Sequence, residues 1–450
     1  MKSLLKTTTF LAALLCGSSL FANPLLDADW WKTADIAAVD AAVAEGYDVT
    51  AMDGSSYTPL VRALRAKAST DMIRHLVEIG ADVSRPSHDA RPAIFWAAAY
   101  GNLDAVNTVL DLGGDITALD DSHRTALAYA AFRQTDPAVF ARLIELGLDP
   151  SAIDDSGRNA ALSAAYMNPE ISVLNLLIDA GSDISAKTVE GRDAFMLAAQ
   201  RNGSLDVIQT MQALSDNPMA LDTEGKDALL LAAGRNTVEV VSYLLEQGFS
   251  LDAVDGEDST ALLIASYRGS WEMMGWLLEQ GQDVNAANAN GQTPLLESIT
   301  RQSAETVTAL LAVGADVSAT NASGENAVLI AAARTRSGAE DVLAVLLAAG
   351  GTVSAADGDG TTALIAAVRS QKSLDAVNSL LAAGADVNAQ DGDDYSALMF
   401  AALRANDPAI IEALLAAGAD ASFEDTFGDT AATLIEDNDA LAGSAVADLL

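Results

Sequence analysis

Small and apolar residues recur along the chain with a period of about 34 residues. The stretch LLAAGADVN, which begins at Leu380, returns as LLAAGADAS beginning at Leu414. A regular spacing of this length is typical of stacked repeats, whereas a single globular core has no reason to repeat it. The pattern therefore predicts a solenoid in which each repeat buries its apolar face against the next.

Each repeat opens with a short apolar motif, such as DALLLAA at Asp227 or TALLIAS at Thr260. The first residue of the motif is of a type that caps a helix or occupies its first turn, and small and apolar residues follow it. We therefore expect an inner helix at each of twelve openings, which begin at Thr58, Pro92, Thr125, Asn159, Asp193, Asp227, Thr260, Thr293, Asn326, Thr362, Ser396 and Thr430.

A second, amphipathic run follows about nine residues further on, as in residues 238–248, VEVVSYLLEQG. It predicts an outer helix that ends at a glycine, which can adopt the left-handed C-cap conformation. The next stretch, such as ADVNA or SDISA, leads to an Asp-x-x-Gly turn like that of residues 222–225. This turn predicts a short β-hairpin between consecutive repeats.

Two repeats depart from this pattern. Residues 211–221 end an outer helix without the glycine, which predicts a bend or a soft point in the stack. Residues 334–341 add to the usual repeat length, which predicts a longer turn between the two helices of that repeat. At the start of the array, residues 30–51 resemble an outer helix followed by a hairpin, and we expect them to cap the first repeat.

The repeated unit of two helices and a hairpin, with a T-[PA]-L opening and a G-A-D-[VI]-[NS]-A close, resembles the ankyrin repeat. The resemblance covers about residues 30–450. It implies an all-α repeat solenoid of about eleven stacked ankyrin repeats, each a helix-turn-helix with a β-hairpin. We expect a signal peptide in residues 1–22, an N-terminal capping segment in 23–52, the repeat array in 53–424 and a C-terminal capping repeat in 425–450.

The first 22 residues have the features of a secretory signal. Lys2 and Lys6 precede a short apolar run, and a small residue, Ala22, stands at its exit. The sole cysteine, Cys16, lies in this segment after Leu15, where a lipoprotein signal favours a small residue. We expect export to the periplasm, with release from the cell as the alternative, and no disulfide in the mature chain.

Charge narrows the classes of partner. The chain has 63 acidic and 25 basic residues and a net charge of −38, and loss of the signal would remove two of the lysines. Such a field repels nucleic acid and anionic membranes, and no later segment is apolar for long enough to span a bilayer. We expect no nucleic-acid partner, no stable membrane insertion, no cofactor and a monomeric chain.

Catalytic and metal-binding chemistry is sparse. The chain has three histidines: His75 falls on an expected outer helix, whereas His88 and His123 fall near expected hairpins, so we do not expect them to share a site. No nucleophile or zinc-protease motif is present, and the acidic turns of residues 357–361 and 391–394 lack the full spacing of a calcium loop. These features predict a protein that is not an enzyme and has no metal site.

Arginine recurs at the end of the inner helices, at or near one repeat of spacing. We call these eight residues the ladder: Arg133, Arg201, Arg235, Arg268, Arg301, Arg334, Arg369 and Arg404. Two interpretations stay open. In the structural one, each arginine caps the last carbonyls of its helix and pairs with an aspartate of the neighbouring hairpin. In the functional one, the ladder is an exposed stripe that binds carboxylates or phosphates.

A second basic row precedes the inner-helix motif in the early repeats. This pre-motif row consists of Arg91, Arg124, Arg158, Arg192 and Lys226, and later repeats lose it. The same early repeats have Tyr100, Phe132 and Tyr166 near the end of the inner helix, and aromatic residues beside arginine are typical of binding hot spots. We therefore predict a contact surface centred on repeats two to five. The alternative is that these rings pack between repeats.

The resemblance implies a protein-binding scaffold that uses a concave surface of hairpin tips and inner helices. The residues expected to contact a partner are Arg91, Tyr100, Arg124, Phe132, Arg133, Arg158, Tyr166, Arg192, Arg201, Arg235 and Arg268. Similar exported bacterial ankyrin proteins imply a stress-response partner such as a catalase, although no residue here identifies one. The alternative function is an acidic exported binder of cations or polymers without a single protein partner.

Overall fold

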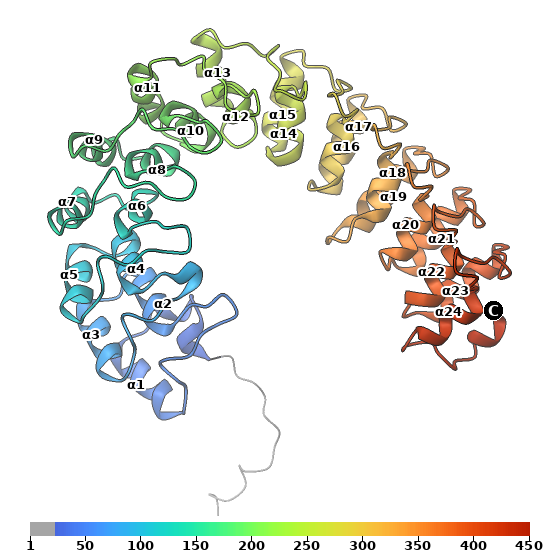
Figure 1. Cartoon of the computed structure of the whole chain (residues 1–450), viewed down its shortest axis with the longest axis horizontal. Coiled ribbons are helices and arrows are strands. Elements are labelled where there is room, and N and C mark those ends of the chain that lie inside the picture. The colour runs from blue at the N-terminus through green and yellow to red at the C-terminus, as the bar shows by residue number, and fades with distance from the viewer. Residues whose placement is uncertain (1–22) are drawn as a thin grey trace, which may run out of the picture. The chain divides into compact units, whose positions relative to one another are not determined.

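The structure is a computed structural model that describes residues 23–450. The segment expected as a signal peptide, including Cys16, lies outside the described residues. The chain divides into two units, residues 23–186 (unit 1) and 187–450 (unit 2). Each unit is a stack of helix pairs joined by turns, as Figure 1 shows. The predicted all-α repeat solenoid of ankyrin type is confirmed.

Unit 1 contains four inner helices, which pack against one another in sequence order, and five outer helices. The inner helices are α2 (Pro59–Arg65), α4 (Ala93–Tyr100), α6 (Ala126–Ala131) and α8 (Ala160–Met167). The outer helices are α1 (Ile36–Ala44), α3 (Thr70–Glu78), α5 (Leu103–Asp111), α7 (Pro137–Glu145) and α9 (Ile171–Asp179). Helix α1 is preceded by two short 3₁₀ helices, η1 (Pro24–Leu26) and η2 (Trp30–Lys32), so an outer helix begins the array as predicted.

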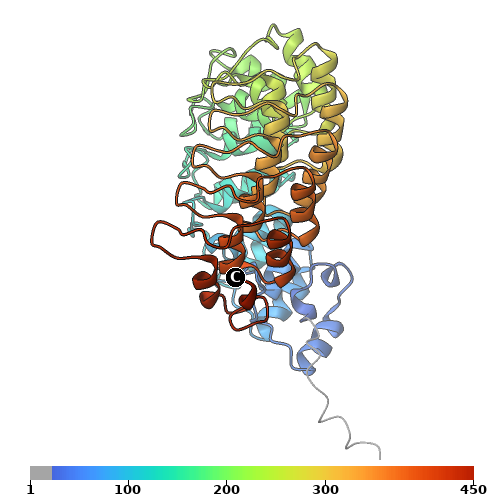
Figure 2. The same cartoon turned by 90° about the vertical axis from the view of Figure 1, so that its right-hand side faces the viewer.

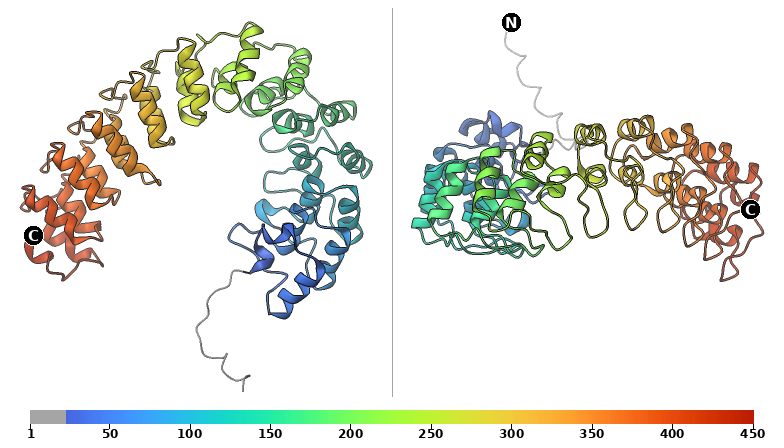
Figure 3. Two further views of the ribbon diagram at one scale, coloured as in Figure 1. Left: turned by 180° about the vertical axis from the view of Figure 1, so that it is seen from behind. Right: turned by 90° about the horizontal axis from the view of Figure 1, so that it is seen from above.

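Unit 2 continues the same order of inner and outer helices. Its inner helices are α10 (Ala194–Arg201), α12 (Ala228–Ala233), α14 (Ala261–Arg268), α16 (Pro294–Ile299), α18 (Ala327–Ala333), α20 (Ala363–Arg369), α22 (Ala397–Arg404) and α24 (Ala431–Leu434). Its outer helices are α11 (Leu205–Leu214), α13 (Val238–Glu246), α15 (Trp271–Glu279), α17 (Ala304–Ala312), α19 (Ala339–Ala348), α21 (Leu374–Ala382) and α23 (Pro408–Ala416). The turns between repeats project to one side of these helices (Figures 2 and 3).

All twelve predicted openings are the N-cap residues of inner helices. In ten of them the side chain accepts a hydrogen bond from the backbone N–H three residues on, as Thr260 Oγ1 does from Leu263 N at 3.2 Å. Pro92 cannot make this bond, and Thr430 does not make it. Each such cap contributes about 1 kcal/mol, so the motif fixes where the inner helices begin.

Outer helices end at glycines with positive φ, such as Gly248 at +94°. The exception is α11, which ends at Ser215 with φ of −77°, so the absence of a glycine cap there is confirmed. The longer turn predicted in repeat nine is also present, because five residues separate α18 from α19. In the described residues the predicted hairpins form as turns with isolated bridges, such as Gln390 to Ser396, rather than as paired strands.

Candidate protein-binding surface

The two basic rows occupy different environments. In the ladder, Arg334 is half-buried and the other seven arginines are exposed. In the pre-motif row, Arg91 is buried at 4% exposure, and the other four side chains are half-buried. The sequence pattern did not distinguish the rows in this respect.

Three members of the pre-motif row, Arg91, Arg192 and Lys226, form ion pairs with turn aspartates of the following repeat. Arg91 Nε lies 2.9 Å from Asp120 Oδ2, and the Asp120 side chain is fully buried. The second oxygen of Asp120 accepts backbone N–H bonds from Ser122 at 2.9 Å and from Arg124 at 3.0 Å. The ion pair of Arg91 therefore joins its repeat to the turn of the next repeat, and Arg91 has a structural role.

The same arrangement recurs at the start of unit 2. Arg192 Nε lies 2.8 Å from Asp222 Oδ2, and Lys226 Nζ lies 3.6 Å from Asp255 Oδ2. One repeat later, Ser259 stands at the pre-motif position in place of a basic residue. The turn residue of the following repeat is Asn288, whose side-chain amide donates to Ser259 Oγ at 3.2 Å. The turn residue is asparagine at Asn288 and Asn321 and aspartate again at Asp357, Asp391 and Asp425, so the loss of the basic row does not follow the identity of the turn residue.

Seven of the eight ladder arginines, all but Arg201, form no ion pair with a turn aspartate of the described residues. Apart from Arg201, no ladder arginine makes an ion pair with any of the described residues. Arg334 instead donates to the carbonyl oxygen of Ile299 at 2.7 Å, in the preceding repeat. The ion pairs that the structural interpretation predicts for the ladder are therefore not formed by its arginines other than Arg201, whereas Arg91 and Arg192 of the pre-motif row do pair with turn aspartates.

The predicted aromatic residues pack against arginines within unit 1. Phe132 is buried at 7% exposure and meets Tyr166 edge-on, with ring centroids 6.4 Å apart. The guanidinium carbon of Arg158 lies 4.8 Å from the centroid of the Tyr166 ring. Tyr100 is half-buried, and the guanidinium carbon of Arg133 lies 5.0 Å from its centroid.

The burial of some predicted contact residues makes the predicted contact surface in repeats two to five smaller. Arg91 and Phe132 are buried, so neither is available to a partner in this structure. Arg124 lies beside Asp120 at 3.1 Å and is only half-buried. Partner contact by Tyr100, Arg124, Arg133, Arg158 and Tyr166 stays a prediction.

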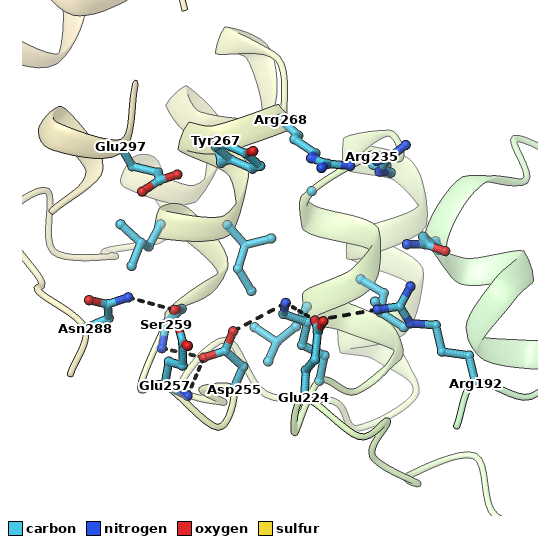
Figure 4. A pocket seen from close by; sticks show the side chains of 17 residues that line it. Arg192, Glu224, Arg235, Asp255, Glu257, Ser259, Tyr267, Arg268, Asn288 and Glu297 are labelled. Carbon is cyan, nitrogen blue, oxygen red and sulfur yellow. Dashed lines mark hydrogen bonds and ion pairs between the residues drawn. The ribbon is translucent and has the colours of Figure 1, made fainter. Parts of the chain in front are cut away.

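A cleft of about 430 Å³ lies in unit 2 on the inner helices α12 and α14 (Figure 4). Apolar side chains, including Leu231, Leu263 and Ile264, line it. Three predicted contact residues, Arg192, Arg235 and Arg268, also line it, and they come from three consecutive repeats. Arg201 is exposed at the end of α10 and is not part of the lining.

A glycine accounts for the hollow. The residue that precedes the ladder arginine is Gln200 at the end of α10 and Tyr267 at the end of α14, but it is Gly234 at the end of α12. All three line the cleft. The missing side chain at Gly234 leaves space between two repeats whose corresponding residues are large.

The two sides of the cleft differ in charge. Arg235 and Arg268 lie on one side near Tyr267, whereas Glu224, Asp255 and Glu257 lie on the side of the turns (Figure 4). The acidic side is largely compensated, because Lys226 Nζ lies 2.6 Å from Glu224 Oε2 and 3.6 Å from Asp255 Oδ2, and Arg192 Nη2 lies 3.7 Å from Glu224 Oε2. The exposed arginines face solvent without such compensation.

Tyr267 and Glu297 complete the side where the ladder lies. The guanidinium carbons of Arg301 and Arg268 lie 4.4 and 5.0 Å from the centroid of the Tyr267 ring. Burial raises the pKa of the Glu297 carboxyl, and the positive charge of Arg301 opposes that rise. Proton uptake by Glu297 as the pH falls therefore makes this side of the cleft more positive.

Sequence reasoning missed a set of side-chain amides that join the repeats. Asn236 Nδ2 donates to the carbonyl oxygens of Ala199 at 2.8 Å and Asn202 at 3.0 Å. Gln134 Nε2 makes the same pair of bonds to Ala98 and Gly101, both at 2.9 Å. The signal was present in the sequence, because an Asn or Gln stands nine residues after the motif opening at Gln134, Asn168, Asn202, Asn236 and Gln302.

Large apolar side chains are exposed in the turns of both units. In unit 2, Val189, Leu221 and Val254 are 68%, 60% and 44% exposed, and in unit 1 Ile153 is 63% exposed. Leu221 and Val254 each stand one residue before the turn aspartate of their repeat. Apolar residues that recur in register on exposed turns are a feature of interaction surfaces.

Membrane spans and metal clusters are two further features that can be checked in the described residues. Between residues 23 and 450 no helix is both long enough and apolar enough to cross a bilayer. Within the same range, no three His, Cys, Asp or Glu side chains are grouped so that they could hold a metal ion. His75 and His123 pair with different aspartates, Asp40 and Asp155, in different repeats.

Comparison with known families agrees with this architecture. A family model described as ankyrin repeats in three copies matches residues 94–188, 195–288, 250–321, 269–357 and 300–391. A second, described as ankyrin repeats in many copies, matches residues 380–435. No curated protein matches the chain. The chain belongs to the ankyrin-repeat family, whose members are typically non-catalytic protein-binding scaffolds.

Proposed function

We propose that this protein is an exported scaffold that binds a protein partner through the turn and inner-helix surface of unit 2. The observation that carries the proposal is the exposure of Leu221 and Val254 on consecutive turns beside the cleft residues Asp255 and Glu257. Exposed apolar side chains in register are costly to leave in water and gain free energy when a partner covers them.

Charge supports a specific partner over a general binder of cations or polymers. A binder of cations needs free carboxylates, yet Glu224 and Asp255 beside the cleft are paired with Lys226. Arg235 and Arg268 line the cleft without an ion pair to the described residues, as Glu257 does on the turn side. Such a mixture of exposed apolar and cationic side chains fits a protein surface.

The test is affinity capture from extracts of the organism's own cells. A Leu221→Ser/Val254→Ser variant should lose a partner that the wild-type chain captures. The matched control is Leu214→Ser/Val313→Ser, since those side chains are 48% and 51% exposed at the ends of outer helices. Capture lost equally in both variants, or in neither, would contradict the proposed surface.

Export, a monomeric state and a stress-response partner such as a catalase belong to the same proposal. Export rests on the composition of residues 1–22. Cell fractionation with N-terminal sequencing tests it, and light scattering on the purified chain tests the oligomeric state. A purified catalase that fails to bind the wild-type chain would eliminate that partner and leave the binding surface unaffected.

A further inference from the structure

We infer that the cleft on α12 and α14 binds an extended partner segment in which carboxylate side chains recur at every third residue. The inference rests on the proposed function and specifies the chemistry of the partner. It follows from three properties of unit 2: the uncompensated arginines, the spacing of the inner helices and the hollow at Gly234.

The arginines define the charge of the segment. Arg235, Arg268 and Arg301 are exposed at the ends of three consecutive inner helices, and none has an ion pair with the described residues. The chain contains 63 acidic residues, yet none of them forms an ion pair with these three arginines. A guanidinium group binds a carboxylate through two parallel hydrogen bonds, and an acidic segment would complement this row.

The spacing of the helices defines the conformation. Helix α14 packs against both α12 and α16, and packed helices lie about 8–10 Å apart. A polyproline II segment advances about 3.1 Å per residue and returns to the same face every third residue, so its side chains recur at about 9 Å. Alternate residues of a β-strand recur at about 6.6 Å, and successive turns of an α-helix at about 5.4 Å. The polyproline II spacing matches the spacing of packed helices, so carboxylates at every third residue can meet arginines at corresponding positions of consecutive inner helices.

The apolar part of the cleft near Gly234 determines which side chains the partner segment should have between its carboxylates. Gly234 is in the right-handed helical region, with φ of −77° and ψ of −20°, so the backbone does not require glycine there. A Cβ atom at this position would lie 3.0 Å from Ile264 Cγ2. That contact is tight, so glycine here lets Ile264 of the next repeat approach closely, and the cleft beside it is lined by Leu231 and Ile264, which fits an apolar side chain of the partner.

The acidic side of the cleft does not oppose this mode of binding. Glu224 and Asp255 are compensated by Lys226, at 2.6 and 3.6 Å, and they lie on the turn side (Figure 4). At physiological salt the Debye length is about 8 Å, so the more distant acidic residues of the chain are screened. The arginines in contact with the segment then determine the interaction.

The probe is a labelled synthetic peptide with the sequence Glu-Pro-Leu repeated four times, which favours polyproline II and puts all glutamates on one face. Binding to the purified chain is measured by fluorescence anisotropy at physiological salt. We expect saturable binding that weakens at least about tenfold in Arg235→Gln/Arg268→Gln, because each lost charge-assisted pair costs a factor of about ten or more.

The matched control is Arg369→Gln/Arg404→Gln, which removes the same charge from two exposed ladder positions outside the cleft. It should change the affinity by less than about twofold, as screened charges do. Gly234→Leu should weaken binding by filling the hollow, while circular dichroism confirms that each variant keeps its helices.

Three results would overturn the inference. The first is equal loss of affinity in both arginine double variants. The second is equal binding of a peptide with the same composition but contiguous glutamates, and the third is no saturable binding to the wild-type chain. If the peptide fails while Leu221→Ser/Val254→Ser still abolishes capture of a partner, the inference falls and the proposed function stands.

Discussion

The pre-motif row and the ladder occur in both units but place basic side chains in different environments, as one example from each unit shows. In unit 1, Arg91 is buried between Asp120, at 2.9 Å, and the ring of Tyr129, whose centroid is 4.2 Å away. In unit 2, Arg235 and Arg268 are exposed beside a cleft and make no ion pair with the described residues. Depending on its position in the repeat, an arginine of this acidic solenoid either forms a buried ion pair that joins consecutive repeats or lies exposed on the surface.

A single residue position decides whether the end of an inner helix is filled or hollow. Phe132 fills it at the end of α6, whereas Gly234 leaves it empty at the end of α12. Both residues are followed directly by a ladder arginine. The fold therefore allows a recess to form at one repeat without altering the stacking of its neighbours.

Arg91→Ala should have the largest effect among the substitutions that test the difference between the buried pre-motif row and the exposed ladder. Removing one partner of a buried ion pair leaves the Asp120 carboxylate less compensated, which costs about 3–5 kcal/mol. We expect a large fall in the urea midpoint, measured by circular dichroism. Arg235→Ala is the matched control and should change stability by less than about 0.5 kcal/mol. Similar effects of the two substitutions would mean that the rows do not differ as described.

A feature that both units share should give similar effects in each. Asn236→Ala removes two hydrogen bonds to carbonyls of the preceding repeat, at 2.8 and 3.0 Å, and should cost about 1–3 kcal/mol. Gln134→Ala in unit 1 should cost a similar amount, because it makes the same bonds. Thermal unfolding measures both, and a cost confined to one unit would show that the amides are not equivalent.

Asp227→Asn should stabilise unit 2 by up to about 1 kcal/mol at neutral pH. Burial raises the pKa of the Asp227 carboxyl from its ordinary value of 3.8, so its ionised form costs folding free energy above that value. Asparagine caps a helix equally well and occupies this position at Asn159. The gain should disappear below about pH 3.8, where aspartate is neutral in both states; a gain independent of pH would exclude this cause.

The smallest expected effect is that of Arg268→Gln. The side chain is exposed and its contact is the ring of Tyr267, with the guanidinium carbon 5.0 Å from the centroid. Stability should change by less than about 0.5 kcal/mol in a urea titration. A loss of 2 kcal/mol or more, on the order of a lost buried contact, would assign this arginine to packing.

Much of the fold could be predicted because its signals are local. A capping residue followed by apolar residues placed all twelve inner helices, whereas the bend or soft point expected at residues 211–221 stays a prediction. These signals depend on backbone hydrogen bonds within a few residues. The predicted β-hairpins were less accurate, because the side chain of the turn aspartate satisfies the backbone N–H groups that strand pairing would use, as Asp222 does for Glu224 and Lys226.

The candidate surface could be predicted only in part. The sequence identified both arginine rows, but which row is buried depends on contact with the next turn, as between Arg91 and Asp120. The cleft depends on an absent side chain, and a glycine at a helix end also resembles an ordinary cap, so Gly234 gave no distinct signal. Neither property is local in the sequence.

The most direct test of the central claim is arginine modification with phenylglyoxal, followed by mass spectrometry of the folded chain with and without the Glu-Pro-Leu peptide. Without peptide, Arg235 and Arg268 should react fast and Arg91 slowly. With peptide, Arg235 and Arg268 should become protected while Arg369 and Arg404 keep their rates. Equal reactivity of Arg91 and Arg235, or protection at Arg369 and Arg404 in place of the cleft, would contradict the account.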